Sequence, residues 1–67
     1  MLDPLTERQA LKTEVTELHH SIARWEAEFE TTPPAAIRHR EWLEMQVSYA
    51  RQRLGVIAGL LAGLDQA

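Results

Sequence analysis

The pair of residues in this chain that comes nearest to a metal-binding motif is Glu17 and His20, which are separated by two residues. A Glu-x-x-His pair supplies ligands to a di-iron centre when both side chains project into the interior of a helical bundle. Here Leu18 and Ile22 mark the apolar side of the same predicted helix, and Glu17 and His20 lie away from that side. We therefore expect a solvated helix face with no metal and no cofactor.

Other catalytic chemistry is equally poorly supported by the sequence. The chain has no cysteine, so it offers no thiolate ligand, no cysteine nucleophile and no disulfide. Ser21 and Ser48 lack a local nucleophile signature, and His19 and His39 have no partner at ligand spacing. A chain of two helices also has little interior for a cleft. We expect no catalytic residues and no enzymatic activity.

The length and the charge of the chain limit the remaining functions. A chain of 67 residues makes one small domain, residues 1–67, of marginal stability on its own. Its formal net charge of -3 disfavours nucleic acid as a partner. The N-terminus lacks the features of a secretory signal peptide, and the uncharged run 54–64 has about half the length of a membrane span. We therefore expect a cytoplasmic protein that binds neither nucleic acid nor membrane.

The first predicted helix spans about residues 4–30. Its start is marked by Asp3 as the N-cap and Pro4 at the first helical position, with Thr6 and Gln9 as a second possible cap. Its apolar residues alternate at intervals of four and three, which is typical of one helical stripe facing one neighbour. They are Leu11, Val15, Leu18, Ile22, Trp25 and Phe29.

A second predicted helix spans about residues 35–64, after a turn at 31–34. Pro33 and Pro34 interrupt the first helix, and we expect Thr32 to serve as the N-cap of the second. The apolar stripe of this second helix has the same alternation as that of the first. It comprises Leu43, Val47, Ala50, Leu54, Ile57, Leu61 and Leu64.

Two long helices joined by a short turn predict an all-α fold, an antiparallel helical hairpin with coiled-coil-like packing. Counting from the turn places Phe29 beside Ala36, and Trp25 beside Arg40 and Leu43. The acidic end of the first helix, with Glu26, Glu28 and Glu30, should then lie against Arg38 and Arg40 at the start of the second helix.

The second helix carries a further apolar stripe that the first helix cannot cover, because the stripe lies about a third of a turn round from the hairpin stripe. Exposed groups that include Trp, Tyr and Met often mark interfaces, although a wide core face is the simpler interpretation. Gly55, Gly59 and Gly63 form a row at its edge that would let another helix approach closely, unless they merely fray the helix end. The predicted partner-binding residues are Trp42, Met45, Tyr49, Val56, Gly59, Leu60 and Gly63.

The run from Trp42 to Asp65 resembles the C-terminal half of the YscE family of type III secretion proteins, which includes PscE and AscE. The similarity lies in an aromatic-containing start, a polar stretch over 44–53 and a C-terminal part rich in Leu, Ile, Ala and Gly. The Pro33-Pro34 turn departs from the family pattern. The resemblance implies a cytoplasmic co-chaperone that pairs with a tetratricopeptide-like (TPR-like) chaperone of the YscG type and, with it, keeps the needle subunit soluble before export.

Two alternatives stay open on the sequence. The same second stripe and glycine row would suit a homodimeric four-helix bundle with a structural or regulatory role, and self-association is also expected while a true partner is absent. An RNA-binding hairpin that uses arginines such as Arg38, Arg40, Arg51 and Arg53 predicts an affinity that falls steeply with salt.

Overall fold

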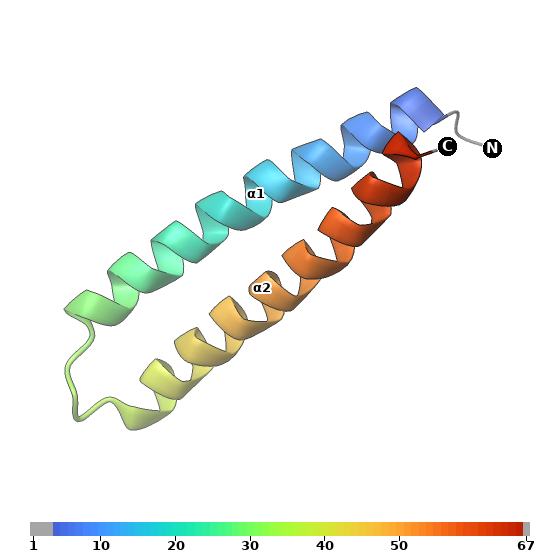
Figure 1. The fold of residues 1–67 in the computed structure, drawn as a ribbon. Coiled ribbons are helices and arrows are strands. Elements are labelled where there is room, and N and C mark those ends of the chain that lie inside the picture. The colour runs from blue at the N-terminus through green and yellow to red at the C-terminus, as the bar shows by residue number, and fades with distance from the viewer. Residues whose placement is uncertain (1–3, 67) are drawn as a thin grey trace.

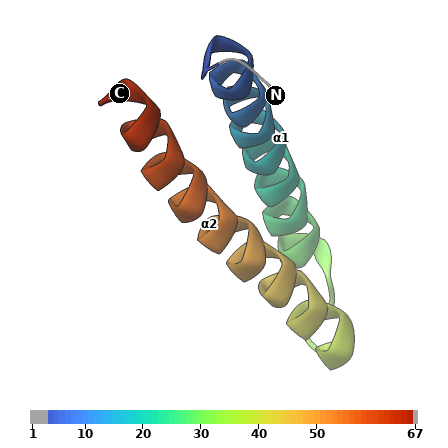
Figure 2. The same ribbon diagram turned by 90° about the vertical axis from the view of Figure 1, so that its right-hand side faces the viewer.

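The computed structural model describes residues 4–66, and they form two long helices packed antiparallel (Figure 1). Helix α1 spans Pro4–Thr31 and helix α2 spans Ile37–Asp65. The hairpin is elongated, measuring 50 × 18 × 15 Å, and the start of α1 and the end of α2 lie at the end opposite the turn. A second view shows that the two helices are inclined to each other (Figure 2). The predicted all-α hairpin is confirmed, whereas the predicted Asp3 cap lies outside the described residues.

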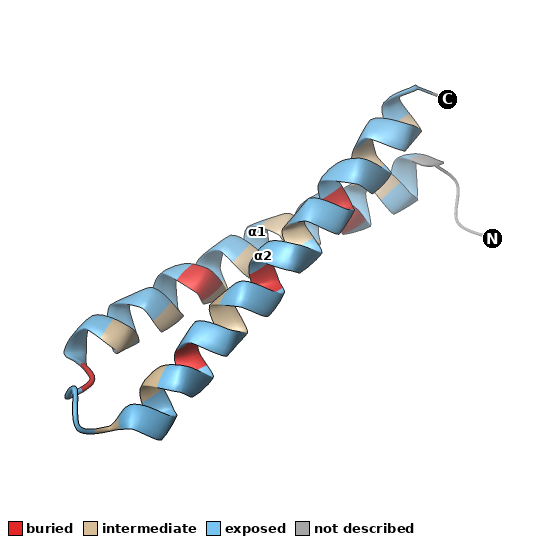
Figure 3. Ribbon diagram, turned by 60° about the horizontal axis from the view of Figure 1, so that its bottom comes forward, coloured by how far each residue is buried: buried red, intermediate tan, exposed pale blue. Residues whose placement is uncertain are grey.

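The core is a single seam along the facing sides of the two helices (Figure 3). On α2 the buried residues are Leu43, Ala50 and Ile57, spaced seven apart, and on α1 they are Leu11 and Ile22. Leu43 and Ile57 are completely buried, with 0% exposure. Every other residue of the two predicted hairpin stripes is half-buried. The four-three alternation therefore identified the contact faces correctly, because it keeps one line of side chains turned toward the neighbouring helix.

The connection between the helices differs from the predicted turn. It covers residues 32–36, and Ala36 rather than Thr32 is the N-cap of α2, without any side-chain capping hydrogen bond. The Thr32 hydroxyl instead donates to the carbonyl oxygen of Glu28 at 2.6 Å. Thr32 is buried there, and its hydroxyl satisfies one of the orphan carbonyls at the end of α1. A threonine hydroxyl can cap the N-terminus of the helix that follows it or the C-terminus of the helix that precedes it, and Thr32 does the latter.

The contacts of Arg40 next to the turn also differ from the predicted ones. The Arg40 guanidinium lies over the Phe29 ring, 4.1 Å from its centroid, and donates to the Thr32 carbonyl oxygen at 3.0 Å. The prediction placed Arg40 beside Trp25, so the ring that its guanidinium contacts is one helical turn from the predicted one. Trp25 and Leu43, which were also predicted to be neighbours, line the same hollow. α2 begins two residues later than predicted, and the long side chain of Arg40 reaches the Phe29 ring and the Thr32 carbonyl oxygen beside the turn.

The ion pairs of the hairpin differ from the predicted set as well. Glu26 pairs with Arg51 at 3.6 Å. Glu28 lies 3.6 Å from His39, a contact that is an ion pair only when the imidazole is protonated. Neither Arg38 nor Arg40 forms an ion pair within residues 4–66, since Arg40 is committed to a ring and a carbonyl oxygen. The predicted pairing of the acidic end of α1 with these two arginines is therefore wrong.

Two further ion pairs tie the helices together away from the turn. Arg53 of α2 binds Glu14 of α1 through two hydrogen bonds, and Arg8 pairs with Asp65 at 2.6 Å. Together with the contacts near the turn, they span almost the whole length of the hairpin. Within the described residues, neither helix has the length of apolar sequence that would let it cross a membrane.

Candidate partner-binding surface

We call the predicted binding residues Trp42, Met45, Tyr49, Val56, Gly59, Leu60 and Gly63 the α2 outer face. Its five large side chains are between 46% and 57% exposed. Their position follows from the seam, because Leu43, Ala50 and Ile57 face α1 and each residue advances by about 100° around a helix. The outer face is thereby directed away from α1 along most of the length of α2.

The aromatic end of the α2 outer face is braced from α1. The rings of Trp42 and His39 stack at 6.1 Å between centroids with an interplanar angle of 8°. His39 in turn lies with its Nε2 atom 3.6 Å from a carboxylate oxygen of Glu28 on α1, and it forms an ion pair there when it is protonated. This bracing restricts the indole in the free protein, which reduces the entropy lost when a partner covers it. The sequence offered a signal for this contact in the spacing of three residues between His39 and Trp42, which places them on one helix face.

Arg53 is a charged residue at the border of the outer face, between the levels of Tyr49 and Val56. Both hydrogen bonds of its guanidinium go to Glu14, at 2.5 and 3.0 Å. Those hydrogen bonds, together with the positive charge of Arg53, hold the pKa of Glu14 below its ordinary value. The same hydrogen bonds, together with the negative charge of Glu14, raise the pKa of Arg53. The charge beside the apolar stripe is therefore compensated by α1.

The glycine row leaves open space along the outer part of α2. A Cβ atom built on Gly55, Gly59 or Gly63 meets nothing within 4 Å, so no part of the hairpin requires glycine there for close packing. None of the described glycines has a positive φ angle either. The hairpin itself therefore gives no reason for three glycines, each of which costs up to about 1 kcal/mol of helix stability relative to alanine.

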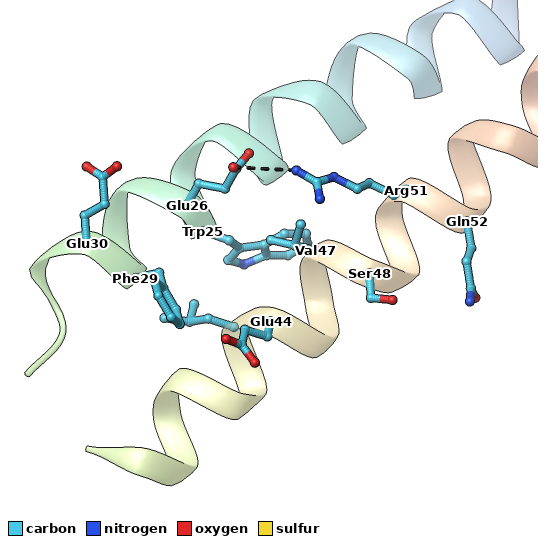
Figure 4. A pocket seen from close by; sticks show the side chains of 10 residues that line it. Trp25, Glu26, Phe29, Glu30, Glu44, Val47, Ser48, Arg51 and Gln52 are labelled. Atoms are coloured by element: carbon cyan, nitrogen blue, oxygen red, sulfur yellow. Dashed lines mark ion pairs between the residues drawn. The ribbon is translucent and has the colours of Figure 1, made fainter. Parts of the chain in front are cut away.

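A groove on the other flank of the hairpin was not identified from the sequence. It is an open hollow of about 680 Å³ between the helices (Figure 4). Its apolar lining consists of Trp25 and Phe29 of α1 and Leu43 and Val47 of α2. Periodicity assigned all four to the seam, and it cannot show how far apart two inclined helices hold their side chains. We call this hollow the inter-helix groove.

The residues first considered for metal chemistry lie elsewhere. Glu17 and His20 are exposed and line a hollow on α1 together with Ser21, Ala23 and Arg24. Among residues 4–66, no three His, Asp or Glu side chains come together in a way that could hold a metal ion.

Comparison with known proteins finds no family model, no curated protein and no solved structure that matches this chain.

Proposed function

We propose that this hairpin is a binding subunit without catalytic activity, which captures a larger helical protein through the α2 outer face. The observation that carries the proposal is the line of five large, half-exposed apolar side chains on one side of one helix. An amphipathic helix that lays its apolar side into a groove is a common mode of protein recognition. Interface cores are enriched in the Trp, Tyr and Met that this face contains.

The amount of exposed surface supports the same role. A compact monomer of 7.7 kDa has about 4300 Å² of accessible surface. The hairpin has 5174 Å². The excess of about 870 Å² is close to the ~800 Å² that one partner buries in a standard protein interface. Association would therefore bring the chain to the degree of burial of an ordinary small domain.

The resemblance to the YscE family suggests which class of protein the partner belongs to. We propose a cytoplasmic co-chaperone of type III secretion whose partner is a TPR-like chaperone and which, with that chaperone, keeps the needle subunit soluble and competent for export. Stacked helical repeats present the extended concave surface that a single apolar helix face fits. A marginal hairpin and its chaperone would then stabilise each other through binding.

The test is co-expression with the TPR-like chaperone and needle subunit encoded nearest to this chain's gene. Leu60→Asp and Val56→Asp should each abolish co-purification, because a carboxylate would be buried in an apolar interface. Ala58→Asp is the matched control, since Ala58 is exposed on α2 between them but lies outside the outer face. Circular dichroism should show similar helicity in all three variants. If the chaperone still co-purifies with both outer-face variants, this face is not the binding surface.

A homodimeric four-helix bundle is the second candidate, and the unfilled space at the glycine row favours it. Three glycines on one side of α2 would let a second copy of α2 approach closely across a two-fold axis. Light scattering over a range of concentrations, alone and with the chaperone, separates the candidates. A dimer that persists in the presence of the chaperone favours the bundle, whereas a dimer that gives way to a heteromeric complex favours the co-chaperone.

A further inference from the structure

The inter-helix groove has an apolar floor that the hairpin leaves accessible. Trp25 and Phe29 are only half-buried, although they belong to the seam, and Leu43 beneath them is fully buried. Figure 4 shows Trp25 and Val47 between the two helices. The lining of α2 runs from Leu43 to Gln52, about 14 Å at 1.5 Å per residue. A groove of this length matches two to three turns of a helix.

The charges around this floor are predominantly negative. Glu26, Glu30 and Glu44 line the groove, and Arg51 is the single cation among its lining residues. Arg51 is paired with Glu26, whereas Glu30 and Glu44 form no ion pair within residues 4–66. Even with Arg40 counted beside Phe29, three carboxylates stand against two guanidinium groups.

The unpaired carboxylates are grouped at one end. Glu30 is near the end of α1 and Glu44 near the start of α2, so both belong to the turn end of the groove (Figure 4). The compensated pair of Glu26 and Arg51 lies farther from the turn. Arg40 lies over Phe29 at the same end, so one guanidinium stands there against the two carboxylates of Glu30 and Glu44. The groove therefore combines aromatic and aliphatic floor residues with an end of net negative charge, which favours a ligand that is apolar on one side and basic at one end.

We infer that the inter-helix groove binds a short, basic amphipathic helix of a partner protein, with apolar residues on Trp25 and Phe29 and with Lys or Arg near Glu30 and Glu44. This site is separate from the α2 outer face, because the two surfaces lie on opposite flanks of α2. The inference does not depend on the co-chaperone proposal. It would allow the hairpin to hold two protein segments at once.

The chain's two tryptophans report the two surfaces separately, since Trp25 lies in the groove and Trp42 on the outer face. The experiment titrates the full chain with a 15-residue amphipathic peptide of Leu, Ala and Lys and follows the two indole N–H signals by NMR. We expect the Trp25 signal to shift and the Trp42 signal to stay. A peptide with Glu in place of every Lys should bind at least fivefold more weakly, and added salt should weaken the Lys peptide selectively.

The matched variants test the charge argument. Glu30→Gln with Glu44→Gln should weaken the Lys peptide roughly fivefold, the effect of two partly exposed ion pairs. The control is Glu7→Gln with Glu41→Gln, which removes the same charge from exposed positions outside the groove and should leave affinity unchanged.

Three results would overturn the inference. The first is that the Lys and Glu peptides bind equally well, or that neither binds. The second is a shift of the Trp42 signal in place of the Trp25 signal. The third is a Trp25 shift that depends on protein concentration alone, which would assign the groove to a second copy of the chain. A failure of this kind leaves the outer-face experiment unaffected, and loss of chaperone binding in Leu60→Asp leaves the peptide titration unaffected.

Discussion

Arg53 on α2 donates two hydrogen bonds to Glu14 on α1, from Nε to Oε2 at 2.5 Å and from Nη2 to Oε1 at 3.0 Å, across 39 positions of sequence. A planar guanidinium that binds both oxygens of one carboxylate fixes orientation as well as distance. The pair therefore fixes the alignment of the two helices away from the turn. It also neutralises the charge that borders the α2 outer face.

The Glu14–Arg53 pair predicts an acid-sensitive contribution to stability. Hydrogen bonding from Arg53 lowers the pKa of Glu14 in the folded chain below the ordinary value of 4.5. The contribution is therefore complete above about pH 4.5 and is lost as pH falls through the lowered folded-state pKa. Urea unfolding from pH 7 to pH 2.5 should show the stability gap between the wild type and Glu14→Gln closing below pH 4.5.

Arg53→Met serves as the companion variant for that measurement, because it removes the donor and leaves the carboxylate. Its stability gap from the wild type should close over the same pH range. A gap that stays constant down to pH 2.5 in both variants would mean that the pair does not form in solution. Both side chains are partly exposed, so the gaps should also shrink in high salt.

The burial of the seam predicts large losses of stability when either of its two fully buried residues is truncated. Leu43→Ala and Ile57→Ala should each cost about 2–4 kcal/mol, through lost burial and the cavity left behind. A hairpin this small has little stability to lose, so we expect both variants to be largely unfolded by circular dichroism at 25 °C. Met45→Ala, at an exposed position on the same helix, should change stability by less than about 0.5 kcal/mol. Equal effects at all three sites would contradict the seam.

The contacts of Arg40 predict a loss of stability when its planar guanidinium is replaced by another cationic group. Arg40→Lys keeps the charge but loses the planar group over Phe29 and the directed hydrogen bond to Thr32, and it should cost about 1 kcal/mol. The measurement is the midpoint of thermal unfolding. Arg38→Lys is the control, since Arg38 is exposed and forms no ion pair in the described part of the chain. If both variants have the same unfolding midpoint as the wild type, the contacts of Arg40 with Phe29 and Thr32 do not stabilise the hairpin.

The glycine row predicts opposite effects on folding and on association. Gly59→Ala should stabilise the isolated hairpin by up to about 1 kcal/mol, because the added methyl group meets nothing within 4 Å. If the row faces a partner helix, the same change should weaken association with the chaperone or with a second copy. The inverse control is Ala58→Gly, which should lower stability and leave association unchanged. Stabilisation by Gly59→Ala without any loss of binding would assign the row no part in an interface.

The α2 outer face could be predicted from the sequence because its position is geometrically tied to the seam. Once Leu43, Ala50 and Ile57 face α1, the direction of Tyr49 and Leu60 follows from the helical repeat, and the structure exposes both. The brace on Trp42 needed the structure, because His39 pairs with a residue of the other helix. Which protein covers this face is a property of the partner's surface as well, and it remains a proposal.

The sequence by itself determined the two helices, their antiparallel order and the residues of the seam, because local spacing and two prolines set these features. Tertiary structure alone decided the direction in which Thr32 caps, the position of Arg40 over Phe29 and the opening of a groove beside Trp25. These three depend on how far apart and at what inclination two helices settle once their seam is packed. That choice balances contacts between residues distant in sequence, which no local pattern records.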